Sequence, residues 1–98
     1  MLKSPELPET KVSSPKPIRF SHHARQQMTL RGASDREVIS AIRTGASAPA
    51  KQGRLSFRKD IRFGGMWGGH HYATKRVLAI VVDKPTELVV VTVYTFYF

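Results

Sequence analysis

The stretch Leu88-Val-Val-Val-Thr-Val-Tyr-Thr-Phe-Tyr-Phe98 decides the fold predicted for this chain. It is built from β-branched, aromatic and leucine residues without glycine, proline or charge, which is typical of a central β-strand. Strand side chains alternate between the two faces of a sheet. The alternation predicts three valines on one face and two hydroxyl side chains on the other: Val89, Val91 and Val93, against Thr92 and Tyr94. The hydroxyls have either a chemical role or a hydrogen-bonding role in or beside the core.

The segment 1–17 differs in composition from the rest of the chain. It contains four of the six prolines, interspersed with Ser, Thr, Lys and Glu. A segment so polar and so interrupted by proline is typical of a linker or a disordered arm. We therefore predict an arm over residues 1–17 and one folded domain over residues 18–98.

Two short helices are predicted at the start of this domain. Ser21 is a typical N-cap and Gly32 a typical stop, so the first helix lies between them. Residues four apart share one flank of a helix, and here that flank consists of His23, Gln27 and Arg31. Ser34 and Glu37 have the spacing of a capping box, and Gly45 ends the second helix. Its predicted buried stripe is Val38, Ile39, Ala41 and Ile42.

After Gly45 the pattern of apolar and polar residues changes from the period of a helix to the alternation that is typical of strands. Residues 46–51 are a candidate short edge strand, residues 54–63 alternate in polarity, and residues 76–83 form a further strand. In residues 54–63 the apolar face is Leu55, Phe57, Ile61 and Phe63, and the polar face is Arg54, Ser56, Arg58, Asp60 and Arg62. Residues 64–69 are predicted to be a flexible loop with Trp67 at its tip. The fold class is therefore α+β, with two N-terminal helices packed on a twisted antiparallel sheet of three to four strands.

The charge of the chain favours a polyanionic partner. Sixteen basic residues oppose seven acidic ones, a formal net charge of +9, which suits nucleic acid or an acidic protein. There is no cysteine, so disulfides and thiolate metal sites are excluded. No apolar run approaches the roughly 18 residues of a membrane helix, so we expect no membrane segment in this chain.

Three arginines on one strand face form what we call the arginine ladder: Arg54, Arg58 and Arg62. Neighbouring members are about 13 Å apart on an extended strand, which spans about two phosphates of a single strand. Guanidinium groups suit phosphate oxygens, and Trp67 could stack on a base. The alternative is an ordinary solvated strand face. The sequence thus favours nucleic-acid binding at the ladder.

The histidines occur in two adjacent pairs, His22-His23 and His70-His71. Neighbouring side chains diverge on a helix or strand, and no carboxylate or thiolate lies near either pair in sequence, so we predict no metal site and no cofactor. Histidine as a proton shuttle is the better interpretation. We select His23 and His71 as the two candidate residues for proton transfer.

The first helical unit resembles a family signature. His23-Ala24-Arg-Gln-Gln27-Met28-Thr-Leu-Arg31-Gly32-Ala-Ser34 is similar to His-Ala-x-x-Arg-Met-x-x-Arg-Gly-Ile-Ser, which opens the domain-of-unknown-function family 4258. The resemblance continues at the closing Val91-Thr92-Val93-Tyr94. Gln27 departs from the signature arginine, and Ala33 replaces isoleucine.

The resemblance implies a ribonuclease fold of the RelE, barnase and EndoU type. Many members are carboxy-terminal toxin tips of contact-dependent inhibition and other polymorphic toxin proteins, with tRNA or other RNA as the target. By resemblance, the chain is carried by a secreted or cell-surface protein, acts in the cytoplasm of a target bacterium and is neutralised by an acidic immunity protein. The signature positions implicated are His23, Arg31, Thr92 and Tyr94.

Residues and resemblance together predict a metal-independent endoribonuclease that leaves a 2′,3′-cyclic phosphate. The predicted catalytic residues are His23, His71, Thr92 and Tyr94, and the predicted substrate-binding residues are Arg31, Arg54, Arg58, Arg62 and Trp67. Two alternatives remain open. One is a non-catalytic RNA- or DNA-binding module, and the other is an interaction domain for an acidic protein.

Overall fold

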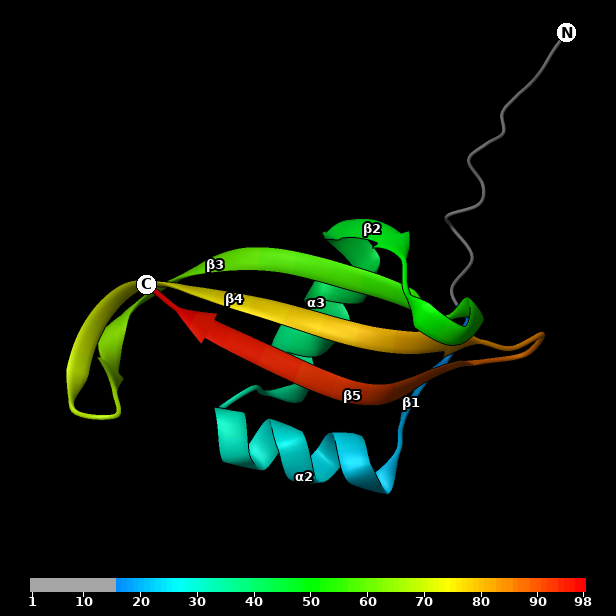
Figure 1. Cartoon of the computed structure of the whole chain (residues 1–98), viewed down its shortest axis with the longest axis horizontal. Helices are drawn as coiled ribbons and strands as arrows, with labels where there is room; N and C mark the ends of the chain where they lie inside the picture. The colour runs from blue at the N-terminus through cyan, green and yellow to red at the C-terminus, as the bar shows by residue number, and fades with distance from the viewer. Residues whose placement is uncertain (1–15) are drawn as a thin grey trace, which may run out of the picture.

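The computed structural model describes residues 16–98, in which two helices lie on a five-stranded sheet (Figure 1). The strand order is β1-β5-β4-β3-β2, with β1 parallel to β5 and every other pair antiparallel. In chain order the elements are β1 (Ile18–Phe20), α2 (His22–Arg31), α3 (Asp35–Thr44), β2 (Ala46–Pro49), the short turn η2 (Lys51–Gly53), β3 (Leu55–Trp67), β4 (His70–Asp83) and β5 (Leu88–Tyr97).

The predicted α+β class is confirmed, and the strand count needs a correction. The sheet is mixed and has five strands, because the three-residue strand β1 pairs in parallel with Leu88–Val90 of β5. A strand so short shows no period in the sequence. The edge strand expected within residues 46–51 is β2, paired with the start of β3.

Both helices begin and end as their sequence signals predict. The Ser21 hydroxyl accepts a hydrogen bond from the Ala24 amide at 3.0 Å, and Gly32 ends α2 in the left-handed conformation with φ 78°. Ser34 and Glu37 form the reciprocal capping box of α3. The buried stripe of α3 lacks Ile39, which is 37% exposed, so that part of the prediction is wrong.

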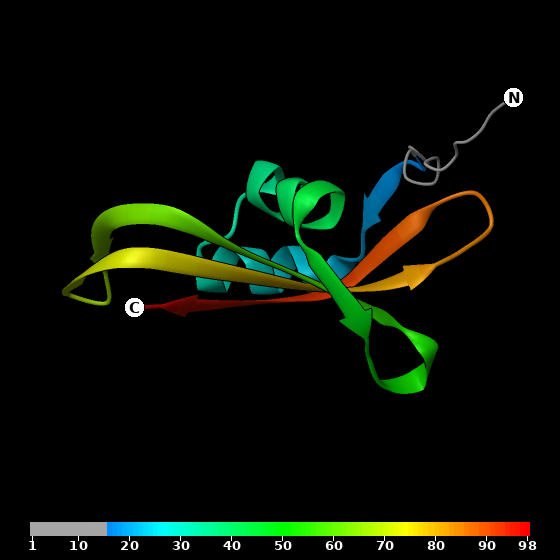
Figure 2. The same cartoon turned by 90° about the horizontal axis from the view of Figure 1, so that it is seen from above.

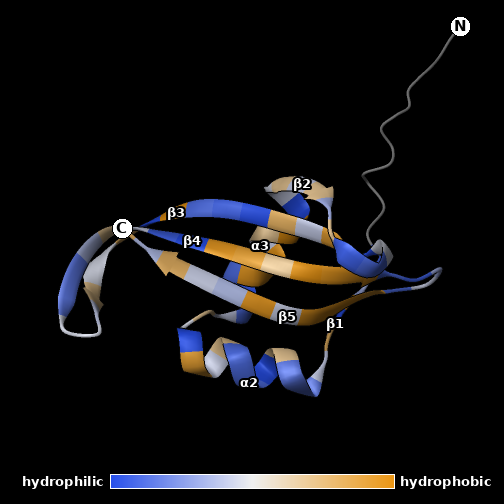
Figure 3. Ribbon diagram, viewed as in Figure 1, coloured by the Kyte–Doolittle hydropathy of each residue, from blue (hydrophilic) through white to orange (hydrophobic). Residues whose placement is uncertain are grey.

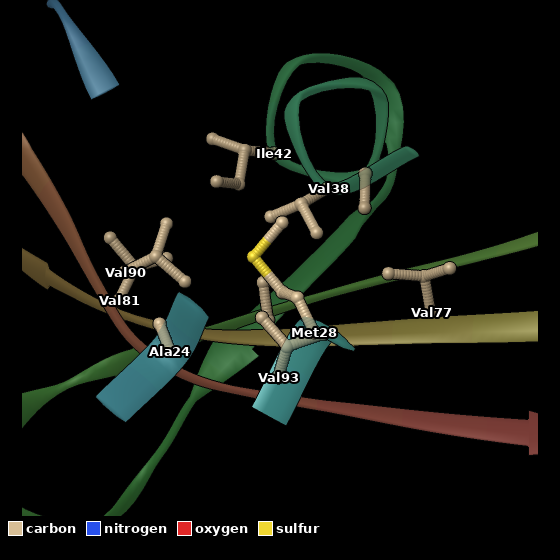
Figure 4. Packing of buried hydrophobic residues seen from close by; sticks show 10 residues of the cluster. Ala24, Met28, Val38, Ile42, Val77, Val81, Val90 and Val93 are labelled. Atoms are coloured by element: carbon tan, nitrogen blue, oxygen red, sulfur yellow. The ribbon is translucent and has the colours of Figure 1, made fainter. Parts of the chain in front are cut away.

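The core lies between the two helices and one face of the sheet (Figure 4). Met28 extends from α2 toward Val38 of α3, above Val93 of β5. The fully buried side chains are mostly valines of the last two strands and small residues of the helices, including Ala24, Val38, Ala41, Val77, Ala79, Val81, Val90 and Val93. Burial of this apolar surface holds the helices on one face and leaves the other face of the sheet uncovered.

A β-bulge in β5 changes the alternation that its sequence predicts. Thr92 lies opposite Ile80 and Val90 lies opposite Val81, so Val91 is one residue in excess. As a result Val90 and Val93 both face the helices, and the prediction that Val89, Val91 and Val93 share one face is wrong. Thr92 and Tyr94 lie together on the uncovered face, as predicted.

The glycine-rich segment continues the β3–β4 hairpin, so the prediction of a flexible loop over residues 64–69 is wrong. β3 runs through to Trp67, and only Gly68 and Gly69 lie between the strands. Trp67 stacks on Tyr97, with ring centroids 4.8 Å apart and planes at 14°. Both rings lie against Gly32, where an added Cβ would come within 2.6 Å of the Trp67 ring. Trp67 is thus fixed by packing on β5 and on the end of α2.

The predicted arm falls mainly outside the described residues. Of residues 1–17, the structure describes Lys16 and Pro17, and both are bound to the domain. Lys16 forms an ion pair with Asp83 at 2.7 Å, and the Pro17 carbonyl accepts a hydrogen bond from the Leu88 amide. These two residues therefore belong structurally to the sheet.

Candidate nucleic-acid interface

One face of the sheet is not covered by either helix. In Figure 1, α3 lies behind β3 and β4 while α2 runs beside β5, so the viewer looks onto the uncovered face. Figure 2 shows the helices on one side of the sheet and the turn η2 projecting from the other side. We call this surface, formed by β3, β4 and β5, the open face.

The arginine ladder lies on the open face. Arg58 is opposite Leu78 and Arg62 is opposite Thr74, whereas the alternate residues of β4 face the core. Arg54 precedes β3 and lines a pocket on the same face. Lys59, the polar break in the apolar face, points to the helices, where its ammonium donates to the hydroxyls of Ser40 and Thr44. The predicted division of β3 into a polar and an apolar face is confirmed for the paired residues 55–62.

The charges of the described residues leave the ladder without carboxylate partners. Each of the five acidic side chains in residues 16–98 forms an ion pair with a base outside the ladder: Lys16–Asp83, Arg19–Glu87, Arg25–Asp35, Lys75–Glu37 and Arg76–Asp60. Within the same residues, the ladder arginines have no salt bridge. Their charge is therefore available to a polyanion.

Asp60 is the one acid on the ladder strand. Its carboxylate accepts two hydrogen bonds from Arg76, at 2.6 and 3.0 Å. These hydrogen bonds lower the pKa of Asp60 and raise that of Arg76, with the Arg76 charge adding to the effect on Asp60. Asp60 thus remains ionised at neutral pH and offsets one positive charge on the open face.

The rest of the open face is apolar and aromatic. Figure 3 shows hydrophilic residues along β3 and hydrophobic residues in the second half of β4 and in β5. Leu78 lies beside Phe96 and Arg58 around a shallow hollow between β2 and β5. Three aromatic side chains of this region are exposed by 39 to 54%: Tyr94, Phe96 and Phe98. Arginines next to exposed aromatic rings are the combination that binds single-stranded nucleic acid.

Arg31 joins α2 to the open face. Its guanidinium donates to the Val93 carbonyl at 2.8 Å and lies 4.7 Å from the centre of the Tyr94 ring. The Arg31 carbonyl accepts hydrogen bonds from the hydroxyls of Thr95 and Tyr97, at 2.8 and 2.7 Å. These contacts fix the end of α2 against β5.

An ion pair between the buried Lys75 and Glu37 also holds the end of α2 against the sheet. Lys75 is 5% exposed, and its ammonium donates to the Gly32 carbonyl at 2.5 Å and to both oxygens of Glu37, at 2.9 and 3.1 Å. Its charge therefore lies at the carboxyl end of α2, where the helix dipole favours a cation. The position of Arg31 is thus fixed from three elements, α3, β4 and β5.

The structure brings some of the predicted site residues together and separates others. Arg31 contacts Tyr94 where α2 runs beside β5, and Thr92, Tyr94 and Arg54 line one pocket. His23 is exposed on α2, on the helix flank that also contains Arg31. Arg31, Arg54, Thr92 and Tyr94 form one candidate site at the junction of α2, β5 and the turn before β3, and His23 lies about two helical turns before Arg31 on α2.

His71 is not among the residues that line the pocket of Thr92 and Tyr94. It belongs to the β3–β4 hairpin, opposite Met66, and lines a different pocket with Arg62 and Thr74. The hairpin itself reaches the end of α2, because Trp67, which follows the pairing partner of His71, packs against Gly32.

Three residues of the open face were not predicted from the sequence. Lys51 lines the pocket with Tyr94, and Arg76 and Phe96 line the hollow beside Arg58. Arg76 and Phe96 could have been found from the strand alternation, because they are directly opposite each other on β4 and β5. Lys51 has no such signal, since η2 is too short to show a period.

Comparisons of the chain with protein-family models, with curated proteins and with solved structures find no match. Among residues 16–98, no three His, Asp or Glu side chains gather into a group that could hold a metal ion. In the same part of the chain, no helix is long and apolar enough to span a membrane.

Proposed function

We propose that the chain is a metal-independent endoribonuclease whose substrate strand lies across the open face. The observation that supports this most strongly is the open face itself, where arginines without carboxylate partners border exposed aromatic rings. Arg31, which is on the same helix as His23, contacts Tyr94 of this face. Binding alone does not need a histidine there, whereas proton transfer does.

The proposed reaction is transfer of the phosphate to the neighbouring 2′-hydroxyl. His23 takes the proton of the 2′-hydroxyl, the 2′-oxygen forms a bond to phosphorus, and the bond from phosphorus to the 5′-oxygen breaks. Arg31 and Arg54 stabilise the charge that develops on the phosphorane oxygens. The leaving oxygen takes a proton from Tyr94 or Lys51, which line the same pocket. The products are a 2′,3′-cyclic phosphate and a 5′-hydroxyl, and DNA is spared because it lacks the nucleophile.

We further propose, from the resemblance to toxin tips, that the domain is the toxic part of a larger secreted or cell-surface protein. It would cleave tRNA or other RNA in the cytoplasm of a target bacterium. An acidic immunity protein that lays carboxylates on the arginine ladder would block the substrate path. Desolvated Arg–carboxylate pairs would make its release slow, and electrostatic attraction would make its association fast and sensitive to salt.

Expression of the domain with and without its neighbouring open reading frame tests the proposal. We expect the domain alone to stop bacterial growth, with RNA fragments that end in a 2′,3′-cyclic phosphate and undiminished cleavage in excess EDTA. Growth that continues while the folded domain accumulates would contradict the toxin proposal. Loss of cleavage in EDTA, restored by a divalent ion, would contradict the mechanism.

The second candidate function is a non-catalytic module that binds RNA or DNA. The observation that favours it is that His71 and Tyr94 line different pockets. Such a module would bind RNA and single-stranded DNA with similar affinity and leave both intact. Incubation of labelled RNA with the purified chain separates the two functions directly.

Asp60→Asn should strengthen RNA binding. The change removes the one acid of the ladder strand and releases Arg76 from its ion pair. One additional bound phosphate on a single strand should steepen the log–log salt dependence of the binding constant by about 0.7. Titration of labelled single-stranded RNA at several salt concentrations measures this slope.

Asp83→Asn is the matched control for this change. It also removes one paired carboxylate, but from the ion pair with Lys16 at the end of β4 and not from the ladder strand β3. If both variants change the slope equally, the effect comes from net charge alone and RNA does not follow the ladder.

A further inference from the structure

A pocket of about 510 Å³ lies where the turn η2 meets the open face. Lys51, Gln52 and Arg54 line it from the segment between β2 and β3, and the sheet contributes Ile80, Thr92 and Tyr94. The volume falls within the range of about 300–1,000 Å³ that is typical of small-ligand sites. With Ala50, its walls offer two apolar side chains, the phenol ring of Tyr94, two cations, an amide and the Thr92 hydroxyl.

Gln52 has an unusual backbone conformation at this pocket. Its φ of 60° and ψ of 34° are left-handed, and among residues 16–98 it is the only non-glycine residue with positive φ. A glutamine in this region costs about 1 kcal/mol or more relative to glycine, and such strain is concentrated at functional sites. The neighbouring Gly53, with φ 71°, shows that glycine fits this turn. A glutamine therefore occupies a position where glycine would be less strained, which points to a use for its side chain.

The two cations and the ring of the pocket match the parts of one nucleotide. Lys51 and Arg54 have no salt bridge among the described residues, since all five carboxylates there are paired elsewhere. Tyr94 is 39% exposed, and the Arg31 guanidinium over its ring holds it in place. A base can stack on such a ring while the cations bind its phosphate.

We infer that this pocket binds a single nucleotide of the RNA and selects its base. Tyr94 stacks the base, Lys51 and Arg54 bind the phosphate, and the Gln52 amide and Thr92 hydroxyl form hydrogen bonds with the base edge. A glutamine amide supplies both a donor and an acceptor, so it discriminates between base edges. The inference rests on the proposed action on RNA and identifies the subsite that chooses the nucleotide.

Titration of the 98-residue chain with the four nucleoside 3′-monophosphates and with inorganic phosphate, followed by NMR, tests the inference. We expect the amide resonances of Gln52 and Thr92 to shift, and one nucleotide to bind about three- to tenfold more tightly than the other three, the effect of one or two hydrogen bonds. Inorganic phosphate should bind more weakly than any of the four. Equal affinity for phosphate and all nucleotides, or shifts confined to other parts of the chain, would overturn the inference.

Gln52→Gly separates recognition from folding. It removes the amide and relieves the left-handed strain, so the variant should unfold at the same or a higher temperature while the base preference disappears. Gln26→Ala removes the same functional group from α2, where Gln26 contacts His22, and should leave the preference unchanged. Base preference that persists in Gln52→Gly would also overturn the inference.

Cleavage of RNA by the same variants distinguishes this inference from the proposed function. If Gln52→Gly cleaves at the same nucleotides as the unaltered chain, the selecting role of the pocket is wrong and the endoribonuclease proposal stands. If the unaltered chain binds one nucleotide selectively at Gln52 but cleaves no RNA, the pocket stands and the endoribonuclease proposal fails.

Discussion

His23→Ala should lower the rate of RNA cleavage by about 10²- to 10⁴-fold, the usual loss when a general base is removed. The His23→Ala variant should also no longer inhibit bacterial growth. The fold should be unaffected, because His23 is exposed and the buried residues of α2 are Ala24 and Met28. Cleavage rates of a defined RNA, with circular dichroism to monitor folding, measure both effects.

His22→Ala is the matched control for this prediction. His22 is the adjacent histidine, contacts Gln26, and lies outside the flank that includes Arg31. It should retain full activity. Thr92→Ala and Tyr94→Phe should each reduce cleavage less than His23→Ala does, since each removes one hydroxyl. A folded His23→Ala chain with undiminished cleavage would remove His23 from the mechanism.

Replacement of all three ladder arginines by glutamine should weaken RNA binding and flatten its salt dependence. Each phosphate of a single strand that the protein no longer neutralises lowers the log–log slope by about 0.7, so three such phosphates lower it by about 2. The predicted consequence is a large loss of affinity at low salt and a much smaller loss at high salt. Fluorescence anisotropy of a labelled single strand between low and high salt gives the slope directly.

A second triple variant controls for net charge. Arg36→Gln, Arg43→Gln and Lys84→Gln remove the same charge from α3 and from the turn between β4 and β5. The slope of this control should change little. Because the register places Arg58 and Arg62 on the open face, an unchanged slope in the ladder variant would mean that RNA binds elsewhere on the chain.

The sequence was most informative where local chemistry alone determines structure. Ser21, Gly32 and the Ser34–Glu37 capping box predicted the helix boundaries, since the caps depend on neighbouring residues only. The alternation of β3 predicted which face the ladder occupies. The bulge at Val91 could not be predicted, because it depends on how β5 pairs with β4. β1 was missed for the same reason, since its partner strand lies about 70 residues further along the chain.

The candidate site was predicted only in part, because its residues are far apart in the sequence and only the fold determines which of them come together. Arg31, Thr92 and Tyr94 were selected individually, and the structure brings them together through contacts between α2 and β5. His71 was selected with them, and the structure places it on a different pocket, which it lines with Arg62 and Thr74. The pocket at Gln52 was not predicted, because its walls come from a three-residue turn and from two strands that follow it.

The junction of α2 with β5 has a consequence for biosynthesis. Arg31 and the Val93 carbonyl that it binds are 62 residues apart in the chain. A chain is made from its amino terminus, so a nascent domain that has reached Asp83 includes His23 and the ladder but neither Thr92 nor Tyr94. Long-range strand pairing is also slow to form. Under the proposed function, the producing cell therefore meets the complete active site only after translation of β5.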